Sequence, residues 1–280
     1  MTSKAPPRPV APRAPAPTPP APPRSALSLG AIPESKGHRV QIYGPGGIGK
    51  TTLAASAPAP VAIIDLDQSL PRLRTRLDAI NVTAGLRVVE NIQSWADLLA
   101  ALNAPGWDEI RTLVIDSATV AEELAVAHTL ATVPKERGER AKNIEDYGYG
   151  KGYQHVYDTF LPLLAHLDAH ARAGRNVMLI CHECNSNVPN PTGPDWIRYE
   201  PRLQTTSSGK ASIRLRIKEW CDHVLFVGYD VDVAEGKAKG SGTAMVYPKE
   251  LPYFMAKSRT LVKSIPLEKC FTDLWPQLLV

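Results

Sequence analysis

The stretch GPGGIGKTT, residues 44–52, decides the fold class of this chain of 280 residues. It matches the spacing G-x-x-x-x-G-K-[ST], with Gly44, Gly49, Lys50 and Thr51 at the defining positions. Because glycines carry no side chains, successive backbone N–H groups can turn inward and form a concave nest for an anion. The pattern has this meaning only where a strand precedes it and a helix follows it.

Both conditions are met in the flanking sequence. RVQIY, residues 39–43, alternates apolar and polar side chains as a strand does, and KTTLAASA, residues 50–57, opens a helix whose N-terminal dipole faces the anion. The stretch is therefore predicted to be a P-loop that binds ATP together with Mg²⁺. The residues predicted to hold the nucleotide are Gly44, Gly46, Gly47, Ile48, Gly49, Lys50, Thr51 and Thr52.

Apolar segments alternate with helical patterns along the rest of the chain. Short buried strands are expected within residues 60–70, 86–90, 111–120 and 176–181, and helices within 94–104, 121–133 and 154–174. A loop is expected over residues 134–153 and a polar loop from His182 to about Ser212. Residues 222–233 and 242–248 flank a Gly/Lys turn and predict a hairpin. This order predicts an α/β fold with a mainly parallel central sheet flanked by helices, plus a C-terminal β-hairpin region.

Composition separates a tail from a folded domain. Residues 1–35 are rich in Pro and Ala and contain no acidic residue before Glu34, so we expect a disordered N-terminal tail there and one domain over residues 36–280. The tail supplies four of the 32 basic residues, and the remaining 28 equal the 28 acidic ones. The domain is therefore near neutral, and nucleic-acid binding would need local clusters of charge. Neither a signal peptide nor a membrane span is indicated, and four cysteines fit a reducing cytoplasm.

Three polar side chains at strand ends are candidates for the chemistry of the site. Asp116 ends the apolar run TLVID and is predicted to hold Mg²⁺ together with Thr51, although a capping role is an alternative. Asp67, two residues after Asp65 and on the same side, can orient or deprotonate water, or can cap a helix instead. His182 at the end of the fourth strand can bond the γ-phosphate, or can be an ordinary structural histidine. With Lys50, Asp67 and His182 form the predicted catalytic set.

The cysteines give a weaker signal. Cys181 and Cys184 form one C-x-x-C, which Cys221 and His223 could complete as a zinc site. A single pair with scattered partners is a weak pattern, so zinc is the less favoured interpretation.

The order of these motifs resembles the RecA-like P-loop ATPases, and more narrowly the phage-encoded ATP-binding proteins related to single-strand annealing recombinases. The resemblance spans about residues 37–266 and rests on GPGGIGKTT, IIDLDQSL, TLVIDSAT, EDYGYGKGY, LICHE and MAKSR. It implies a catalytic acid at Asp67, where the family has the longer glutamate, and a γ-phosphate sensor at His182. It also implies that Lys257 and Arg259 approach the nucleotide of a neighbouring subunit, and hence a homo-oligomer.

The resemblance further implies two loops that contact single-stranded DNA. The first falls on residues 135–151, which contain basic side chains at 135, 137, 140 and 142 beside three tyrosines, Tyr147, Tyr149 and Tyr153. The second falls on residues 185–212, which contain Trp196, Arg198, Tyr199 and Arg202. It is followed by Arg214, Arg216 and Lys218, which share a face if that stretch is extended, although RLRIKEW, residues 214–220, can equally be helical. Cations for phosphates and aromatic rings for base stacking are what single-strand binding requires.

The sequence as a whole predicts a Mg²⁺-ATP-dependent ATPase that acts on single-stranded DNA in phage-type recombination or annealing. A single-strand DNA-binding protein is a further expected partner, and the host cytoplasm is the expected location. Two other classes remain open. One is a P-loop kinase of a small acceptor with PKERGER, residues 134–140, as its lid. The other is a nucleotide-gated loader with little turnover, which the short acid at Asp67 favours.

Overall fold

A computed structural model describes residues 29–31, 37–136, 138–190, 192–234 and 237–279. It divides the chain into two compact units, Met1–Glu34 and Ser35–Val280. The predicted Pro/Ala tail, residues 1–35, lies outside the described residues except for 29–31. All the elements that follow belong to the second unit.

One sheet of eight strands organises this unit, in the order β10-β9-β8-β1-β5-β4-β2-β3. The six strands from β8 to β3 run parallel to their neighbours, whereas β9 and β10 are antiparallel additions at one edge. The bounds are β1 Arg39–Tyr43, β2 Val61–Asp65, β3 Leu86–Val88, β4 Thr112–Asp116, β5 Asn176–Cys181, β8 His223–Ala234, β9 Lys237–Tyr247 and β10 Ile265–Pro266. The predicted α/β fold with a mainly parallel sheet and a C-terminal hairpin is confirmed.

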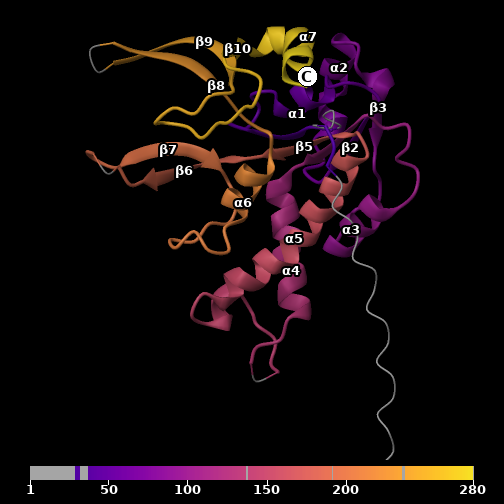
Figure 1. Ribbon diagram of the computed structural model, residues 1–280, viewed down its shortest axis with the longest axis vertical. Helices are drawn as coiled ribbons and strands as arrows, with labels where there is room; N and C mark the ends of the chain where they lie inside the picture. The colour runs from indigo at the N-terminus through magenta and orange to yellow at the C-terminus, as the bar shows by residue number, and fades with distance from the viewer. Residues whose placement is uncertain (1–28, 32–36, 137, 191, 235–236, 280) are drawn as a thin grey trace, which may run out of the picture. The chain divides into compact units, whose positions relative to one another are not determined.

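Helices cover both faces of the sheet (Figure 1). Side chains along β1 alternate between two hydrophobic cores, one on each face of the sheet. Tyr43 belongs to the core on one face, and Val40 and Ile42 belong to the core on the other. The face of Tyr43 is covered by α3 Trp95–Asn103, α4 Ala118–Thr132, α5 Lys151–Arg172 and α6 Ile213–Trp220. The face of Ile42 is covered by α1 Lys50–Ala55, α2 Leu70–Ala79 and α7 Leu267–Leu278.

Local signals in the sequence explain several element boundaries. Ser94 caps α3 by accepting a hydrogen bond from the backbone N–H of Asp97 at 3.2 Å, as its position predicts. Gly174 follows the end of α5 with φ +95°, a conformation that favours glycine. Two 3-10 turns, η1 Thr83–Gly85 and η2 Ile144–Tyr147, lie in connections. No helix within the described ranges is both long and apolar enough to cross a bilayer.

The segment between β5 and β8 differs from its prediction. The expected polar loop contains a two-stranded antiparallel ribbon, β6 Glu183–Val188 and β7 Trp196–Pro201. The stretch after it is helical rather than extended, since Ser212 caps α6 by accepting from the N–H of Leu215. Arg214, Arg216 and Lys218 therefore do not line one face of a strand, and of the two predicted conformations the helical one is confirmed.

Candidate functional site

The P-loop of residues 44–52 joins β1 to α1, as predicted, at the carboxyl ends of the parallel strands. Gly44 is required by close packing, because a Cβ there would lie 2.0 Å from the carbonyl oxygen of Val227 on β8. Gly49 caps α1 with φ +112°, a conformation that L side chains rarely adopt. The glycines of the motif thus have a steric reason in this chain as well as a phosphate-binding one.

Lys50 is nearly buried at 8% exposure, and its ammonium donates to the carbonyl oxygens of Gly44 at 2.7 Å and Pro45 at 2.8 Å. Burial lowers its pKa, while the negative charge of Asp116 acts in the opposite direction. The hydroxyl oxygen of Thr52 is buried and has no hydrogen-bond partner among the described residues. A buried hydroxyl without a partner is unfavourable, and a phosphate oxygen at the start of α1 would satisfy it.

Asp116 and Thr51 lie side by side, as their predicted role as metal ligands requires. The Thr51 hydroxyl donates to Asp116 Oδ2 at 2.6 Å, across the gap between α1 and the end of β4. Desolvation is the main reason that the pKa of Asp116 is raised to about 6, and the hydrogen bond from Thr51 opposes it. Carboxylate and hydroxyl oxygens are the donors that Mg²⁺ prefers, so this pair fits the ion.

Asp67 and His182 contact each other directly. His182 Nε2 lies 3.0 Å from Asp67 Oδ2, and the Ser117 hydroxyl donates to Asp67 Oδ1 at 2.8 Å. Burial alone would raise the pKa of Asp67, but the hydrogen bonds from His182 and Ser117 outweigh it and the pKa lies below its usual value. Asp67 is therefore held as a carboxylate in the cavity described below.

Asp65 and Asp67 have different roles despite their spacing. Asp65 accepts hydrogen bonds from the backbone N–H groups of Ser69 at 3.0 Å and Leu70 at 2.9 Å, at the start of α2. The helix-capping alternative considered for Asp67 thus belongs to Asp65.

A cavity of about 300 Å³ brings the predicted site residues together. It is lined by Gly46, Gly47, Gly49, Lys50, Thr51, Thr52, Asp67, Asp116 and His182 of the predicted set. Gly44 and Ile48 do not line it. Its remaining wall includes Arg72 and Arg76 of α2, which the sequence analysis missed. Two arginines four residues apart lie on the same face of a helix, and this helix follows β2 and Asp67 directly in the sequence. That spacing is a signal that could have identified them.

The first predicted DNA segment is more structured than expected. The Tyr147 hydroxyl donates to the carbonyl oxygen of Val133 at 2.8 Å, and the Tyr153 hydroxyl donates to Glu145. Lys135 and Lys151 form ion pairs with Glu139 and Glu136. Tyr149 alone of the three tyrosines has a fully exposed ring.

This segment is also separate from the nucleotide cavity. None of its described residues lines that cavity, so the PKERGER stretch gains no support as a kinase lid. Arg137, one of its predicted cations, lies outside the described residues.

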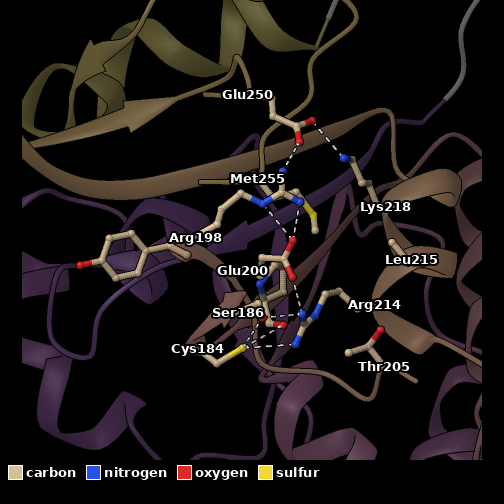
Figure 2. A network of polar contacts seen from close by, with 12 residues as sticks. Cys184, Ser186, Arg198, Glu200, Thr205, Arg214, Leu215, Lys218, Glu250 and Met255 are labelled. Carbon is tan, nitrogen blue, oxygen red and sulfur yellow. Dashed lines mark hydrogen bonds and ion pairs between the residues drawn. The ribbon is translucent and has the colours of Figure 1, made fainter. Parts of the chain in front are cut away.

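The second predicted DNA segment is anchored by buried charges (Figure 2). Glu200 on β7 is 6% exposed and pairs with both Arg198 and Arg214. Arg198 also donates to Glu250 at 2.7 Å, and Glu250 pairs with Lys218 at 3.0 Å. These residues fasten the ribbon to α6 and to the segment around residue 250, so Arg198 and Arg214 are structural and not free to bind phosphates.

What the ribbon leaves exposed is mainly aromatic and apolar. Trp196 is 39% exposed, Ile197 70% and Tyr199 41%. Arg202 and Arg216 are exposed cations near it in sequence. The cations and the aromatic rings predicted for this segment are thus partly available.

Lys257 has internal partners as well. Its ammonium donates to the carbonyl oxygens of Lys218 at 3.0 Å and Cys221 at 2.7 Å, at the end of α6. Arg259 donates to Asp222 at 3.0 Å through a side chain that is 63% exposed. Lys257 thus stabilises the C-terminal end of a helix within its own subunit.

The cysteines do not form a metal site in the described part of the chain. No group of three or more His, Cys, Asp or Glu side chains there could hold a metal ion. Cys181 and Cys221 are fully buried, and Cys184 contacts the guanidinium of Arg214 at 3.2 Å.

The sheet, the P-loop and the cavity with its paired Thr51 and Asp116 define a nucleotide-binding P-loop ATPase domain of the RecA-like α/β class. A family model described as an AAA domain matches residues 36–260, and the chain belongs to that family. No curated protein matches the chain.

Several solved structures are similar at low identity. A KaiC-like protein from Pyrococcus horikoshii is 15% identical, with a TM-score of 0.40 and with 82% of this chain and 85% of that chain covered. A RadB recombinase is 14% identical, with a TM-score of 0.38 and coverage of 76% and 80%. The flagellar accessory protein FlaH from Methanocaldococcus jannaschii is 11% identical, with a TM-score of 0.39 and coverage of 82% and 90%.

Proposed function

We propose that this chain is a Mg²⁺-ATP-dependent ATPase that acts on single-stranded DNA, in recombination or strand annealing. The observation that carries the ATPase proposal is the single cavity that the P-loop lines together with the Thr51–Asp116 and Asp67–His182 pairs. Such a cavity combines an anion cradle, a pair of oxygen donors for a divalent cation and an ionised carboxylate.

Each residue of the proposed site has a defined task. Lys50 exchanges the loop carbonyls for phosphate oxygens, and Thr52 gains the partner that its buried hydroxyl lacks among the residues that the structure describes. Thr51 and Asp116 hold Mg²⁺, which when bound neutralises charge on the phosphates. Asp67 orients the attacking water, while Ser117 and His182 fix the position of its carboxylate.

Contiguity along the chain supports coupling to DNA. His182 contacts Asp67 in the cavity, and the β6–β7 ribbon with its exposed rings begins at the next residue. A change in the contact of His182 can therefore move the ribbon without an intermediate element. The exposed tryptophan and tyrosine of the ribbon can stack on unpaired bases, and nearby Arg202 and Arg216 can pair with phosphates.

The test is ATP hydrolysis by the purified chain with Mg²⁺, with and without single-stranded DNA, using Lys50→Ala as the blank. We expect hydrolysis above the blank and a severalfold increase with DNA. Hydrolysis that DNA leaves unchanged would contradict the DNA part of the proposal. Binding of ATP with turnover no faster than the blank would contradict the enzymatic part.

The last outcome corresponds to a second candidate, a nucleotide-gated loader with little turnover. Asp67 favours this candidate, because its carboxylate is short and already accepts two side-chain hydrogen bonds. The two candidates differ in turnover and share the same nucleotide site.

A further inference from the structure

A second cavity, of about 500 Å³, lies beside the P-loop and shares no lining residue with the nucleotide cavity. We call it the aromatic pocket. It is lined by Pro45, Glu183, Tyr199, Phe226, Gly228, Tyr229, Tyr247, Tyr253 and Phe254. Six of these nine residues are aromatic, although aromatic residues make up only 6% of the whole chain. Such a concentration around one cavity calls for a ligand with flat apolar faces.

The rings of the aromatic pocket are packed against one another at its base and open at its mouth. Phe226 stacks on Tyr199 with ring centroids 5.5 Å apart and on Phe254 with centroids 4.7 Å apart. Phe254 is fully buried, whereas Tyr229 and Tyr253 are 54% and 51% exposed. A flat group that enters the pocket can therefore extend an existing stack and be covered by the outer tyrosines.

The polar lining of the pocket is acidic. Glu183 is its single charged lining residue, and within the described chain its carboxylate makes no ion pair and no hydrogen bond. Burial raises the pKa of Glu183, and the positive charge of Lys50 acts against this. With no cation in the lining, the pocket is unsuited to a phosphate. It suits a neutral ring that carries N–H donors for the carboxylate.

The aromatic pocket and the nucleotide cavity lie toward opposite faces of the central sheet. Phe226 and Phe254 belong to the core on the face of Tyr43, whereas α1, whose N-terminus forms the anion cradle, covers the other face. The two cavities share no lining residue. Pro45 and Glu183 connect them, because Pro45 belongs to the P-loop and Glu183 follows His182.

We propose that the aromatic pocket receives one unpaired base of single-stranded DNA, stacked on Tyr199 and Tyr253 and hydrogen-bonded through its exocyclic amine to Glu183. This inference rests on the proposed function, and it adds Tyr253 and Glu183, which lie outside the two predicted DNA loops, to Tyr199 of the second loop. A base fits on three counts: it is flat, it is neutral, and its phosphates remain outside on the strand.

The carboxylate gives the site a base preference. The N4 amine of cytosine donates a hydrogen bond that a glutamate carboxylate can accept. Thymine has a carbonyl oxygen at the same position and can donate none. Glu183 therefore favours strands of deoxycytidine over strands of thymidine. Stacking alone would bind both, because each base has a π-face.

The test measures binding of fluorescein-labelled oligodeoxycytidine and oligothymidine by anisotropy at one fixed salt concentration, together with the Kd for Mg²⁺-ATP. The variants are Tyr253→Ala, its ring-retaining control Tyr253→Phe, and Glu183→Gln. Tyr253 is half exposed, so its truncation should leave the fold intact, and the thermal midpoint checks this. We expect Tyr253→Ala to weaken binding of oligodeoxycytidine roughly tenfold, Tyr253→Phe to change it less than about twofold, and Glu183→Gln to reduce the cytidine preference.

Three results would overturn the inference, and they can be told apart. Tight binding of both strands that none of the variants changes would show that DNA binds elsewhere, with the proposed function intact. A raised Kd for Mg²⁺-ATP in Tyr253→Ala, with unchanged DNA binding, would assign the pocket to the base of the nucleotide. Binding of neither strand by the wild-type chain would overturn the DNA part of the proposed function and this inference together.

Discussion

At the scale of single residues, the proposed ATPase site depends on the short carboxylate of Asp67. Asp67 reaches the cavity by one methylene less than a glutamate would, and His182 and Ser117 hold it in place. A short side chain with two fixed partners loses little freedom when it orients a water molecule. It also has fewer lone pairs left for that water.

We expect His182→Ala to lower kcat by about tenfold or more, because Asp67 loses the donor that helps to keep its carboxylate ionised and oriented. KM should change little, since the P-loop and not His182 holds the phosphates. His182→Gln keeps an N–H donor and should retain more activity. Steady-state kinetics of the two variants check this. An equal loss in both variants, or a loss confined to KM, would contradict the role given to His182.

At the scale of elements, buried ion pairs hold the β6–β7 ribbon in place. Glu200 is shared by Arg198 and Arg214, and all three side chains are largely buried. Removing one partner from such a network leaves buried charges without compensation.

We expect Glu200→Gln to lower the free energy of unfolding by about 3 kcal/mol, because the buried Arg214 would lose its carboxylate and Arg198 would keep only Glu250. The matched control is Glu123→Gln. It removes an exposed ion pair with Arg202 at 4.0 Å and should cost less than about 1 kcal/mol. Urea unfolding of both variants measures the difference. Similar small losses in both would show that the network contributes little to stability.

The sequence predicted the elements of the sheet better than the elements between strands. The strand over 176–181 and the Ser94 cap follow from apolar runs and short-range hydrogen bonds, which depend on neighbours in the chain. The β6–β7 ribbon was missed because β6, ECNSNV, is almost entirely polar and because the ion pairs that fasten the ribbon to α6 and residue 250 come from distant parts of the chain. The site shows the same division. Lys50, Thr51 and Asp116 were found by motif, whereas the pairing of Asp67 with His182 and the placement of Arg76 require the folded chain.

At the scale of the whole molecule, two buried histidines join segments that are far apart in sequence. His38, directly before β1, and His223, the first residue of β8, stack with ring nitrogens 3.2 Å apart, and His223 also bonds the Ser258 hydroxyl at 2.9 Å. Desolvation is the main reason that the pKa of His223 is lowered to about 4, and the neighbouring His38 adds to the effect. Both rings are therefore neutral in the fold at pH 7.

This pair makes stability depend on pH. The unfolded chain binds a proton at His223 below about pH 6.5, whereas the folded chain does so only near pH 4. The stability of the folded chain that depends on a neutral His223 is thus fully present above pH 6.5 and declines as the pH falls toward 4. We expect the urea midpoint of the wild type to drop over this range, and the drop to be smaller in His223→Gln. An identical pH profile in the two proteins would contradict this.

The contact between Gly44 and Val227 has a consequence for how the protein can change during evolution. The first glycine of the P-loop rests against the strand that carries Phe226 and Gly228 of the aromatic pocket. The start of the P-loop and the β8 backbone are therefore in direct contact, with no side chain of residue 44 between them. A substitution that shifts β8 at the aromatic pocket also shifts the start of the P-loop. Substitutions at the two sites should therefore be correlated among related sequences. A change in the ligand preference of one cavity should be accompanied by a change in the other.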